Sequence, residues 1–401
     1  MLDPMTPLAI SAYTATSAMG HGLSAHLASL RSERTALRKN DFGRMPLPCW
    51  IGRVAGVEDA ALPPAMANWE CRNNRVAWLG LQQDHFLANV LDARARYGPG
   101  RVALLLGTST ASIGATEEAY RALDADGGFA DDVLLPNLHN PHSLSAFVAA
   151  ALELEGPCLT VSTACSSSAK VFASAERMLR LGLADAAVVG GVDTLCDSVM
   201  FGFNALELVS RTPCRPFDCA RDGISIGEAA GFVLLERTAV APGKPRLIGY
   251  GESSDAHHMS TPHPDGRGAE LALRAALARA AVEPGQVDYI NLHGTATIKN
   301  DAMEAALVGR IFPPTTRASS SKGYSGHTLG AAGVLEAVIC LLAMEHDLVP
   351  GNLGAATPDP LCGPQFAWRN ETRRTRVALS NSFGFGGNNA CLAFARASAI
   401  T

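Results

Sequence analysis

Runs of consecutive apolar residues recur along the chain and alternate with segments that have the spacing of helices. In the runs 101–107 and 186–192 nearly every residue is apolar, which is typical of a strand covered on both faces of a sheet. Further runs predict strands at 8–13, 156–161, 229–235, 247–251, 287–292, 376–380 and 390–394.

Helical spacing is clearest in 69–95, where Val76, Leu79, Phe86 and Val90 recur three, four or seven residues apart. We also predict helices at 21–30, 114–124, 143–153, 166–181, 196–212, 268–281, 301–310 and 329–344, with irregular segments at 38–64 and 125–143. Strands that alternate with helices in this way favour an α/β fold with mostly parallel sheets.

The second half of the chain repeats the organisation of the first. Cys165 and His327 each stand between a strand and a helix rich in small residues, so the two units look like counterparts. The Pro- and Gly-containing stretch 241–245 marks the seam. We therefore predict an N-terminal half, residues 1–243, with the candidate cysteine, and a C-terminal half, residues 244–401, with two candidate histidines.

Composition narrows the classes of function. A chain of 401 residues with 47% hydrophobic and 18% charged residues can build a large core, and a net charge of −5 gives no sign of a nucleic-acid partner. The ten cysteines are scattered without the paired spacing of a zinc site, and the first residues do not resemble a signal peptide. No apolar run has the length of a membrane span. These features predict a cytoplasmic protein with reduced thiols.

Cys165 is the candidate nucleophile. It lies where a strand turns into a helix, so the unpaired N–H groups and positive dipole end of that helix favour its thiolate and can hold an oxyanion. A cysteine at an arbitrary buried position is more often an inert hydrophobe, and it is the position at the turn that favours chemistry here.

His293 and His327 follow at the ends of later strands. Each of them alone would be interpreted as a structural histidine. Together with a nucleophilic cysteine they fit acyl transfer from a thioester, because two neutral imidazoles that donate N–H groups can stabilise a second anion formed later.

Five motifs occur in order along the chain, at 163–168, 215–228, 293–301, 321–333 and 381–388. On these motifs the chain resembles the β-ketoacyl-acyl carrier protein synthases, condensing enzymes of the thiolase superfamily. The resemblance implies a thiolase-like α/β fold in which two similar βαβ-rich halves pack as α-β-α-β-α layers. It also implies a decarboxylative Claisen condensation of a cysteine-bound acyl group with a malonyl group on the carrier protein.

The resemblance further implies roles for single residues. Cys165 accepts the acyl group, while His293 and His327 act on the malonyl thioester. The backbone N–H groups of Cys165 and Phe385 form the oxyanion hole, and Phe385 is also a mobile gate between glycines. The residues implied to contact substrate are Thr295, Thr297, Phe383, Phe385 and Gly386.

Lys322 and Glu336 match the family's supporting pair of charged residues. Together with Asn291, Ser380 and Asn381, Glu336 also matches positions that surround a structural Na⁺ or K⁺ in some relatives. The resemblance implies no other cofactor, because the phosphopantetheine arm belongs to the acyl carrier protein.

We expect the acyl carrier protein as a partner and assign its docking to Arg72, Arg75 and Arg211, which are locally basic on an acidic protein. The family also implies a dimer, either a homodimer or a heterodimer with a chain-length-factor-like subunit. The strand 186–192, with the helix 196–209 behind it, is the predicted dimer contact. Neither a nucleic acid nor a membrane span is expected.

Two alternatives stay open. A thiolase would use a second cysteine near the C-terminal glycine loop, where Cys391 stands, although the pair of histidines argues against it. A non-catalytic chain-length-factor-like subunit would lack the nucleophile, whereas Cys165 and both histidines are present. The sequence does not decide between fatty acid and polyene or polyketide synthesis, nor does it define the preferred acyl chain.

Overall fold

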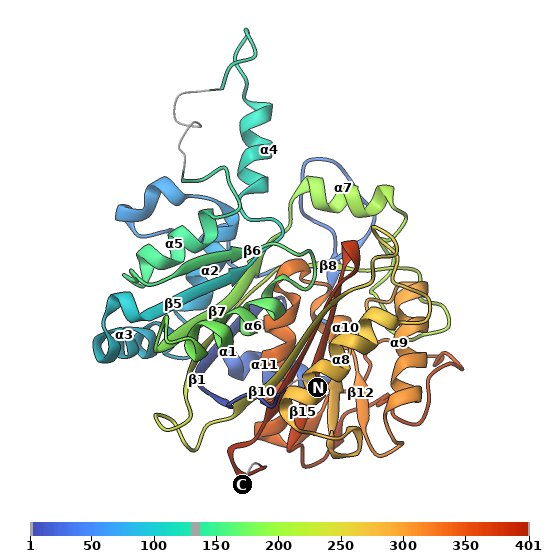
Figure 1. The fold of residues 1–401 in the computed structure, drawn as a ribbon. Coiled ribbons are helices and arrows are strands. Elements are labelled where there is room, and N and C mark those ends of the chain that lie inside the picture. Colours follow the sequence, from blue (N-terminus) through green and yellow to red (C-terminus); the bar gives the residue numbers. More distant parts are fainter. Residues whose placement is uncertain (1–2, 130–136, 400–401) are drawn as a thin grey trace.

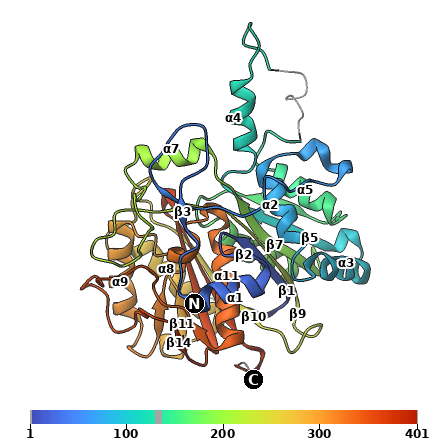
Figure 2. The ribbon, with the colours of Figure 1, turned by 180° about the vertical axis from the view of Figure 1, so that it is seen from behind.

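A computed structural model describes residues 3–129 and 137–399 (Figure 1, and from behind in Figure 2). Its central feature is a long mixed sheet with the strand order β12-β11-β15-β16-β10-β1-β9-β7-β5-β6. The strands of the first half are β1 (Leu8–Ser17), β5 (Val102–Gly107), β6 (Cys158–Val161), β7 (Ala186–Asp193) and β9 (Ala229–Arg237). Those of the second half are β10 (Arg246–Ser254), β11 (Tyr289–Asn291), β12 (Arg317–Ser319), β15 (Val377–Gly384) and β16 (Asn388–Ala395).

The two halves of the sheet repeat one pattern of strand directions. β5 pairs in parallel with β6 and β7, while β7 and β1 pair antiparallel with β9. In the same way, β11 pairs in parallel with β12 and β15, while β15 and β10 pair antiparallel with β16. The halves join at β1 and β10 through the pairs Leu8–Leu247 and Ala9–Arg246. The division into domains at residue 243 stays a prediction.

Helices fill the space between the halves and cover both outer faces. α6 (Ser167–Arg180) and α11 (Ala332–His346) pack against each other and against strands of both halves. The outer face of the first half is covered by α2 (Arg72–Leu81), α3 (Phe86–Tyr97) and α5 (Ser143–Ala151). α8 (Arg267–Ala280) and α9 (Ile298–Ile311) cover the second half. This arrangement confirms the predicted α-β-α-β-α layers.

Alternate side chains of one strand enter different cores, which explains the continuous apolar runs. In β9, Val233 and Leu235 pack in the core between the halves, whereas Phe232 and Leu234 pack in the outer core of the first half. A strand buried on both faces needs apolar residues at every position.

The remaining elements are shorter and lie mostly in connections. The helices are α1 (Gly22–Ser32), α4 (Ile113–Arg121), α7 (Asp197–Ala205) and α10 (Lys322–Ser325), and α4 projects from the body of the fold (Figure 1). The strands are β2 (Gly20–His21), β3 (Arg38–Lys39), β4 (Trp50–Gly52), β8 (Ile226–Gly227), β13 (Leu348–Val349) and β14 (Glu371–Thr372). Part of the predicted loop 125–143 lies outside the described residues.

The prediction of a single helix over 69–95 is wrong. The segment forms α2 and α3, which are separated at Asp84 and His85, both with left-handed backbone angles (φ +52° and +57°). The Asp84 carboxylate accepts hydrogen bonds from the Thr14 hydroxyl at 2.7 Å and from the Leu23 amide at 3.0 Å. These tertiary hydrogen bonds interrupt the helix at this point, although the spacing of apolar residues alone predicts that it continues.

The prediction of a helix over 196–212 is also wrong in its second half. α7 ends at Ala205, and Glu207 takes a left-handed conformation (φ +58°). Residues 206–208 instead form part of the wall of the cavity described below.

The strand 186–192 is not available as the predicted dimer contact. β7 is hydrogen-bonded to β5 on one edge and β9 on the other, and all of its residues are buried. Because both edges are paired, β7 has no free backbone groups for another chain. β6, by contrast, lies at the end of the sheet.

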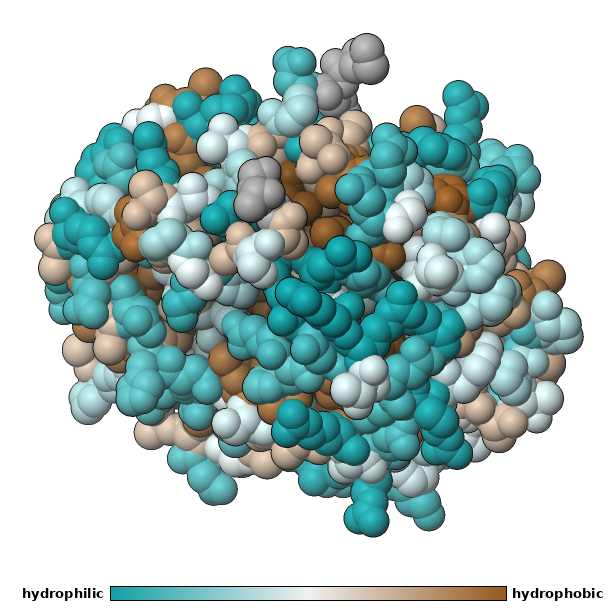
Figure 3. All heavy atoms as spheres, turned by 90° about the horizontal axis from the view of Figure 1, so that it is seen from below, coloured by the Kyte–Doolittle hydropathy of each residue, from teal (hydrophilic) through white to brown (hydrophobic). Residues whose placement is uncertain are grey.

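One helical stretch among the described residues, Leu329–His346, has the length and apolarity of a membrane span. In the fold 89% of this stretch is buried, because it contains the central helix α11. The face of the molecule in Figure 3 is mainly hydrophilic, with scattered apolar side chains.

Candidate active site

Cys165 lies at a sharp turn between β6 and α6. The preceding residue, Ala164, has a left-handed backbone conformation (φ +53°), which is uncommon for a residue with a side chain. The glycine-rich loop after β15 covers this turn from the other half of the chain. A Cβ atom at Gly384 would lie 2.8 Å from the Thr163 carbonyl oxygen, so only glycine allows the loop to approach so closely.

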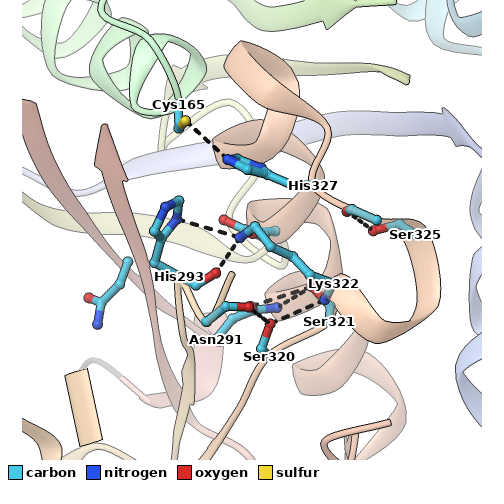
Figure 4. A network of polar contacts seen from close by, with 12 residues as sticks. Cys165, Asn291, His293, Ser320, Ser321, Lys322, Ser325 and His327 are labelled. Atoms are coloured by element: carbon cyan, nitrogen blue, oxygen red, sulfur yellow. Dashed lines mark hydrogen bonds and ion pairs between the residues drawn. The ribbon is translucent and has the colours of Figure 1, made fainter. Parts of the chain in front are cut away.

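Both predicted histidines reach Cys165 from the C-terminal half (Figure 4). Nε2 of His327 lies 3.0 Å from the cysteine sulfur. The rings of His293 and His327 meet edge to face with their centroids 5.4 Å apart. One ring nitrogen of each histidine and the sulfur of Cys165 all lie within 4.8 Å of one another. The structure therefore brings the three residues into one buried site.

The backbone of His327 is held by β8. Its amide donates to the Ser225 carbonyl oxygen at 2.7 Å, and its own carbonyl oxygen accepts from the Gly227 amide at 2.9 Å. Its side chain is oriented at one end only, since Nδ1 has no hydrogen-bond partner among the described residues.

Lys322 orients His293. Its ammonium group donates to the His293 carbonyl oxygen, lies 3.5 Å from Nδ1 of the same residue and forms a buried ion pair with Glu336. An ammonium group can only donate, so Nδ1 of His293 acts as the acceptor and Nε2 carries the proton. This leaves a fixed N–H donor on the far side of the ring.

Burial sets the protonation states of the site. Burial and the nearby Lys322 charge lower the pKa of His293 and of His327 well below the ordinary value, so both imidazoles are neutral. Burial raises the pKa of the Cys165 thiol to about 12, although Lys322 and the Phe385 amide act in the opposite direction. The prediction that the helix N-terminus favours a thiolate stays a prediction, because burial acts on the same thiol in the opposite direction.

Phe385 approaches Cys165 through its backbone. Its N–H group acts to lower the pKa of the Cys165 thiol, as a donor close to the sulfur does. Its ring packs against Phe203 with the centroids 5.5 Å apart. The next residue, Gly386, has φ +75° and donates its amide to the Met259 carbonyl oxygen at 2.7 Å.

A cavity of about 320 Å³ opens onto the site. Four of the predicted substrate contacts line it, namely Thr295, Thr297, Phe383 and Phe385, whereas Gly386 does not. The hydroxyl groups of Thr295 and Thr297 lie 2.9 Å apart. The cysteine, both histidines and this polar pair therefore line the same cavity.

The residues predicted to surround a cation are all buried. Asn291 on β11 is the register partner of Ser380 on β15, and Asn381 follows Ser380 on the same strand. Three oxygen atoms of the set have no hydrogen-bond partner among the described residues: Oε2 of Glu336, Oγ of Ser380 and Oδ1 of Asn381. Buried oxygen atoms without a partner are the type of ligand that a hard cation takes.

Glu304 on α9 was not found from the sequence. Its carboxylate accepts hydrogen bonds from the amides of His293 at 2.9 Å and Gly294 at 2.8 Å, and from the Asn381 side chain at 3.1 Å. Burial raises its pKa to about 7, despite these donors. A carboxylate among the buried positions of a helix was the available signal, because such a residue is almost never buried without partners.

Two of the three arginines predicted to dock a carrier protein have partners within the chain. Arg72 donates to both carboxylate oxygens of the buried Glu228, at 2.8 and 2.5 Å, and Arg75 pairs with Glu70 at 2.5 Å. Arg211 is exposed. The docking role of all three stays a prediction.

Cys391, which a thiolase-like mechanism would need near the site, lies elsewhere. It is fully buried in β16 and packs in the outer core of the second half. The position supports a structural role for this cysteine and leaves Cys165 as the one cysteine among the lining residues of the cavity.

Comparisons with known proteins agree with this geometry. Residues 72–241 match the family model "Beta-ketoacyl synthase, N-terminal domain", and residues 246–356 match "Beta-ketoacyl synthase, C-terminal domain". The chain is 39% identical to the mitochondrial 3-oxoacyl-[acyl-carrier-protein] synthase of Arabidopsis thaliana over 63% of its own length and 59% of that protein. It is 36% identical to nodulation protein E of Rhizobium meliloti (strain 1021), over 73% of its length and 75% of that protein.

One solved structure is similar to this chain over almost the whole length of both. It is that of the ketosynthase ApeO in complex with its chain length factor ApeC from Xenorhabdus doucetiae, with a TM-score of 0.86, 37% identity and 98% of each chain covered. The two family models together span most of the chain, including Cys165, His293 and His327. The chain therefore belongs to the β-ketoacyl synthase family, the condensing enzymes that join two acyl units.

Proposed function

We propose that Cys165 accepts an acyl group from a carrier thioester and that His293 and His327 then drive its condensation with a malonyl thioester. The observation that carries this proposal is the buried trio itself, in which a thiol lies 3.0 Å from one neutral imidazole and a second imidazole is fixed by Lys322. Two neutral N–H donors beside a thiol suit the stabilisation of an enolate.

In the first half-reaction the Cys165 sulfur attacks the thioester carbonyl carbon. The thiol proton passes to Nε2 of His327, 3.0 Å away, and from there to the departing carrier sulfur. A carbon–sulfur bond forms to Cys165 and the one to the carrier breaks. The amides of Cys165 and Phe385 would hold the oxyanion that forms between these events.

In the second half-reaction the malonyl carboxylate leaves as carbon dioxide and its electron pair becomes the enolate. The enolate oxygen accepts hydrogen bonds from the N–H groups of His293 and His327. The tautomer of His327 is not fixed, because its Nδ1 has no hydrogen-bond partner among the described residues. The enolate carbon attacks the acyl carbonyl carbon on Cys165. The carbon–sulfur bond then breaks, the Cys165 thiolate takes up one proton from water, and the product is a β-ketoacyl thioester on the carrier.

The donor of both acyl groups is proposed to be an acyl carrier protein with a phosphopantetheine arm. The cavity of about 320 Å³ supports this, because it is lined both by the paired hydroxyls of Thr295 and Thr297 and by the cysteine. A partly polar cavity of this kind suits an arm that carries amides along a thin chain.

A structural Na⁺ or K⁺ beside the site is a further part of the proposal. The three partnerless oxygens of Glu336, Ser380 and Asn381 fit a hard cation, with Asn291 as a neighbour. The ion would add positive charge near Glu336 and so stabilise its carboxylate, whose pKa burial raises to about 7.

We propose that the working unit is a dimer formed through β6. Among the described residues this strand ends the sheet, and its Leu159 is 43% exposed, so within that part of the chain it has both an unpaired edge and an apolar side chain for another chain. The partner is either a second copy or a chain-length-factor-like subunit, in line with the ApeO–ApeC complex. We expect this assembly in the cytoplasm.

The experiment that tests the proposed function is reconstitution with purified acyl carrier protein. The protein is incubated with an acyl carrier and a malonyl carrier, alone and with a chain-length-factor-like subunit. The expected product is a carrier whose acyl group has gained two carbons and one keto oxygen, read by mass spectrometry. Release of carbon dioxide without a longer acyl group in either mixture would contradict the proposal.

A further inference from the structure

Asp193 ends β7 with a fully buried carboxylate that no sequence motif singled out. Six donors point at its two oxygen atoms. They are the hydroxyl groups of Thr108, Ser109 and Thr110, the amides of Ser109 and Thr110, and the amide of Gly330, at distances from 2.5 to 3.0 Å. A carboxylate can accept about four strong hydrogen bonds, so this one is saturated.

The charge of Asp193 is compensated by hydrogen bonds. Among the residues that the structure describes, no Lys, Arg or His side chain forms an ion pair with Asp193. A buried carboxylate without a cation costs several kcal/mol unless hydrogen bonds replace water, which is what these donors do. A neutral residue would cost less free energy to bury at this position than the carboxylate that the chain has.

The donors come from both halves of the chain. Thr108, Ser109 and Thr110 form the turn that follows β5 in the first half. Gly330 belongs to the turn that follows His327 in the second half, and its amide lies 2.5 Å from Oδ2 of Asp193. A Cβ atom at Gly330 would lie 2.7 Å from the same oxygen, so the two backbones meet directly at this carboxylate.

This contact fixes the far end of the His327 turn. The near end is held by β8, through the hydrogen bonds of the His327 backbone to Ser225 and Gly227. Between the two ends, Leu329 takes a left-handed conformation (φ +54°), which a leucine adopts only when its surroundings enforce it. The turn would relax if the anchor at Gly330 were lost.

We propose that Asp193 is a positioning residue that holds His327 next to Cys165. Its carboxylate binds the Gly330 amide in the turn after His327 and also binds the turn after β5. Through this link the first half of the chain, which carries the nucleophile, aligns the imidazole that the second half provides. The inference rests on the proposed roles of Cys165 and His327.

The charge of Asp193 allows a second, independent measurement of its role, through the pKa of the Cys165 thiol. The charged groups that act on the pKa of the Cys165 thiol are Lys322 on α10, Glu336 on α11 and Asp193 on β7, and the neutral rings of His293 and His327 lie in the same site. Asp193 and Glu336 act to raise the pKa of the thiol, and Lys322 acts to lower it. Removal of the Asp193 charge alone therefore lowers the pKa of Cys165.

The test is Asp193→Asn in the intact protein, with Thr194→Val as the matched control. Thr194 belongs to the same polar cluster, but its hydroxyl donates to Asn73 and not to the carboxylate. In Asp193→Asn we expect condensation to fall at least about tenfold in kcat with little change in KM, since misplacement by about 1 Å can cost about 10²-fold. Alkylation of Cys165 should shift to lower pH. Thr194→Val should change neither.

A folded Asp193→Asn protein with wild-type kcat would overturn the inference, and so would an alkylation profile that does not move. If Asp193→Asn does not fold, Ser109→Ala removes one donor to the oxygen that holds Gly330. It should lower kcat about threefold, within the range that one hydrogen bond accounts for, and an unchanged kcat would again overturn the inference. Failure of the proposed function would look different, because the wild-type protein itself would then not condense.

Discussion

Nε2 of His327 lies 3.0 Å from the sulfur of Cys165, although the two residues are 162 positions apart in the chain. Each stands at the same kind of place, in the turn between an edge strand of one half of the sheet and the central helix that follows it. Each half therefore contributes one member of this pair, and the two meet where the central helices α6 and α11 pack together.

The first prediction concerns the pH dependence of Cys165 alkylation. Burial raises the pKa of this thiol to about 12, above its ordinary value, so the thiolate fraction should rise about tenfold per pH unit from pH 7 to pH 9 without a plateau. The rate of iodoacetamide labelling of the Cys165 peptide, measured by mass spectrometry, checks this. The exposed Cys219 in the same sample serves as an internal control. A plateau for Cys165 below pH 8 would contradict the account.

The second prediction concerns the buried pair of Lys322 and Glu336. Lys322→Met leaves the Glu336 carboxyl without its cation and should cost about 3 kcal/mol of unfolding free energy. The double variant Lys322→Met/Glu336→Leu removes both charges and should recover much of that loss, measured by urea unfolding. Condensation should stay low in both, because His293 loses the donor that fixes its tautomer. Equal stability of the single and double variants would argue against the pair.

The third prediction distinguishes Arg211 from Arg72, two of the residues assigned to carrier docking. Arg211→Glu should raise KM for carrier-bound substrates, more at low than at high salt, because Arg211 is exposed. Arg72→Glu should instead lower stability, since it places an acid beside the buried Glu228. Unfolding curves and KM at two salt concentrations distinguish these outcomes. If Arg211→Glu leaves KM unchanged at low salt, Arg211 takes no part in docking.

The fourth prediction tests β6 as the dimer edge. Leu159→Asp adds a charge to an exposed apolar position on the terminal strand and should shift the assembly toward a species of 41.9 kDa. Sedimentation velocity measures this, and Leu271→Asp is a suitable control because Leu271 is similarly exposed but lies on α8. A wild-type species of 41.9 kDa at all concentrations would rule out a homodimer.

Much of the fold and the reacting trio could be predicted from the sequence. Continuous apolar runs such as 186–192 defined the strands, because burial on both faces leaves no room for polar residues. Cys165, His293 and His327 carry local motifs, so their identity did not depend on three-dimensional contacts. Lys322 and Glu336 could be paired only through the family resemblance, since fourteen residues and a turn separate them.

What could not be predicted depends on contacts between distant segments. The break between α2 and α3 is caused by hydrogen bonds from Thr14 and Leu23 to Asp84, which no local pattern encodes. Glu304 and Asp193 act as acceptors for backbone amides, and a backbone amide leaves no signature in the sequence. The burial that raises the pKa of the Cys165 thiol could not be predicted either, because burial is a property of the whole fold, whereas the helix dipole is a local property.

The most direct test of the central claim is the intact mass of the Cys165→Ala protein after incubation with an acyl carrier protein, with carbon dioxide release from malonyl carrier measured in parallel. Alanine cannot form a thioester, so we predict no gain of acyl mass. Carbon dioxide release should persist, because His293 and His327 remain. His327→Ala is the converse control, and it should still acquire some acyl mass but lose at least about 10²-fold in condensation. A gain of acyl mass by Cys165→Ala at any other residue would contradict the account.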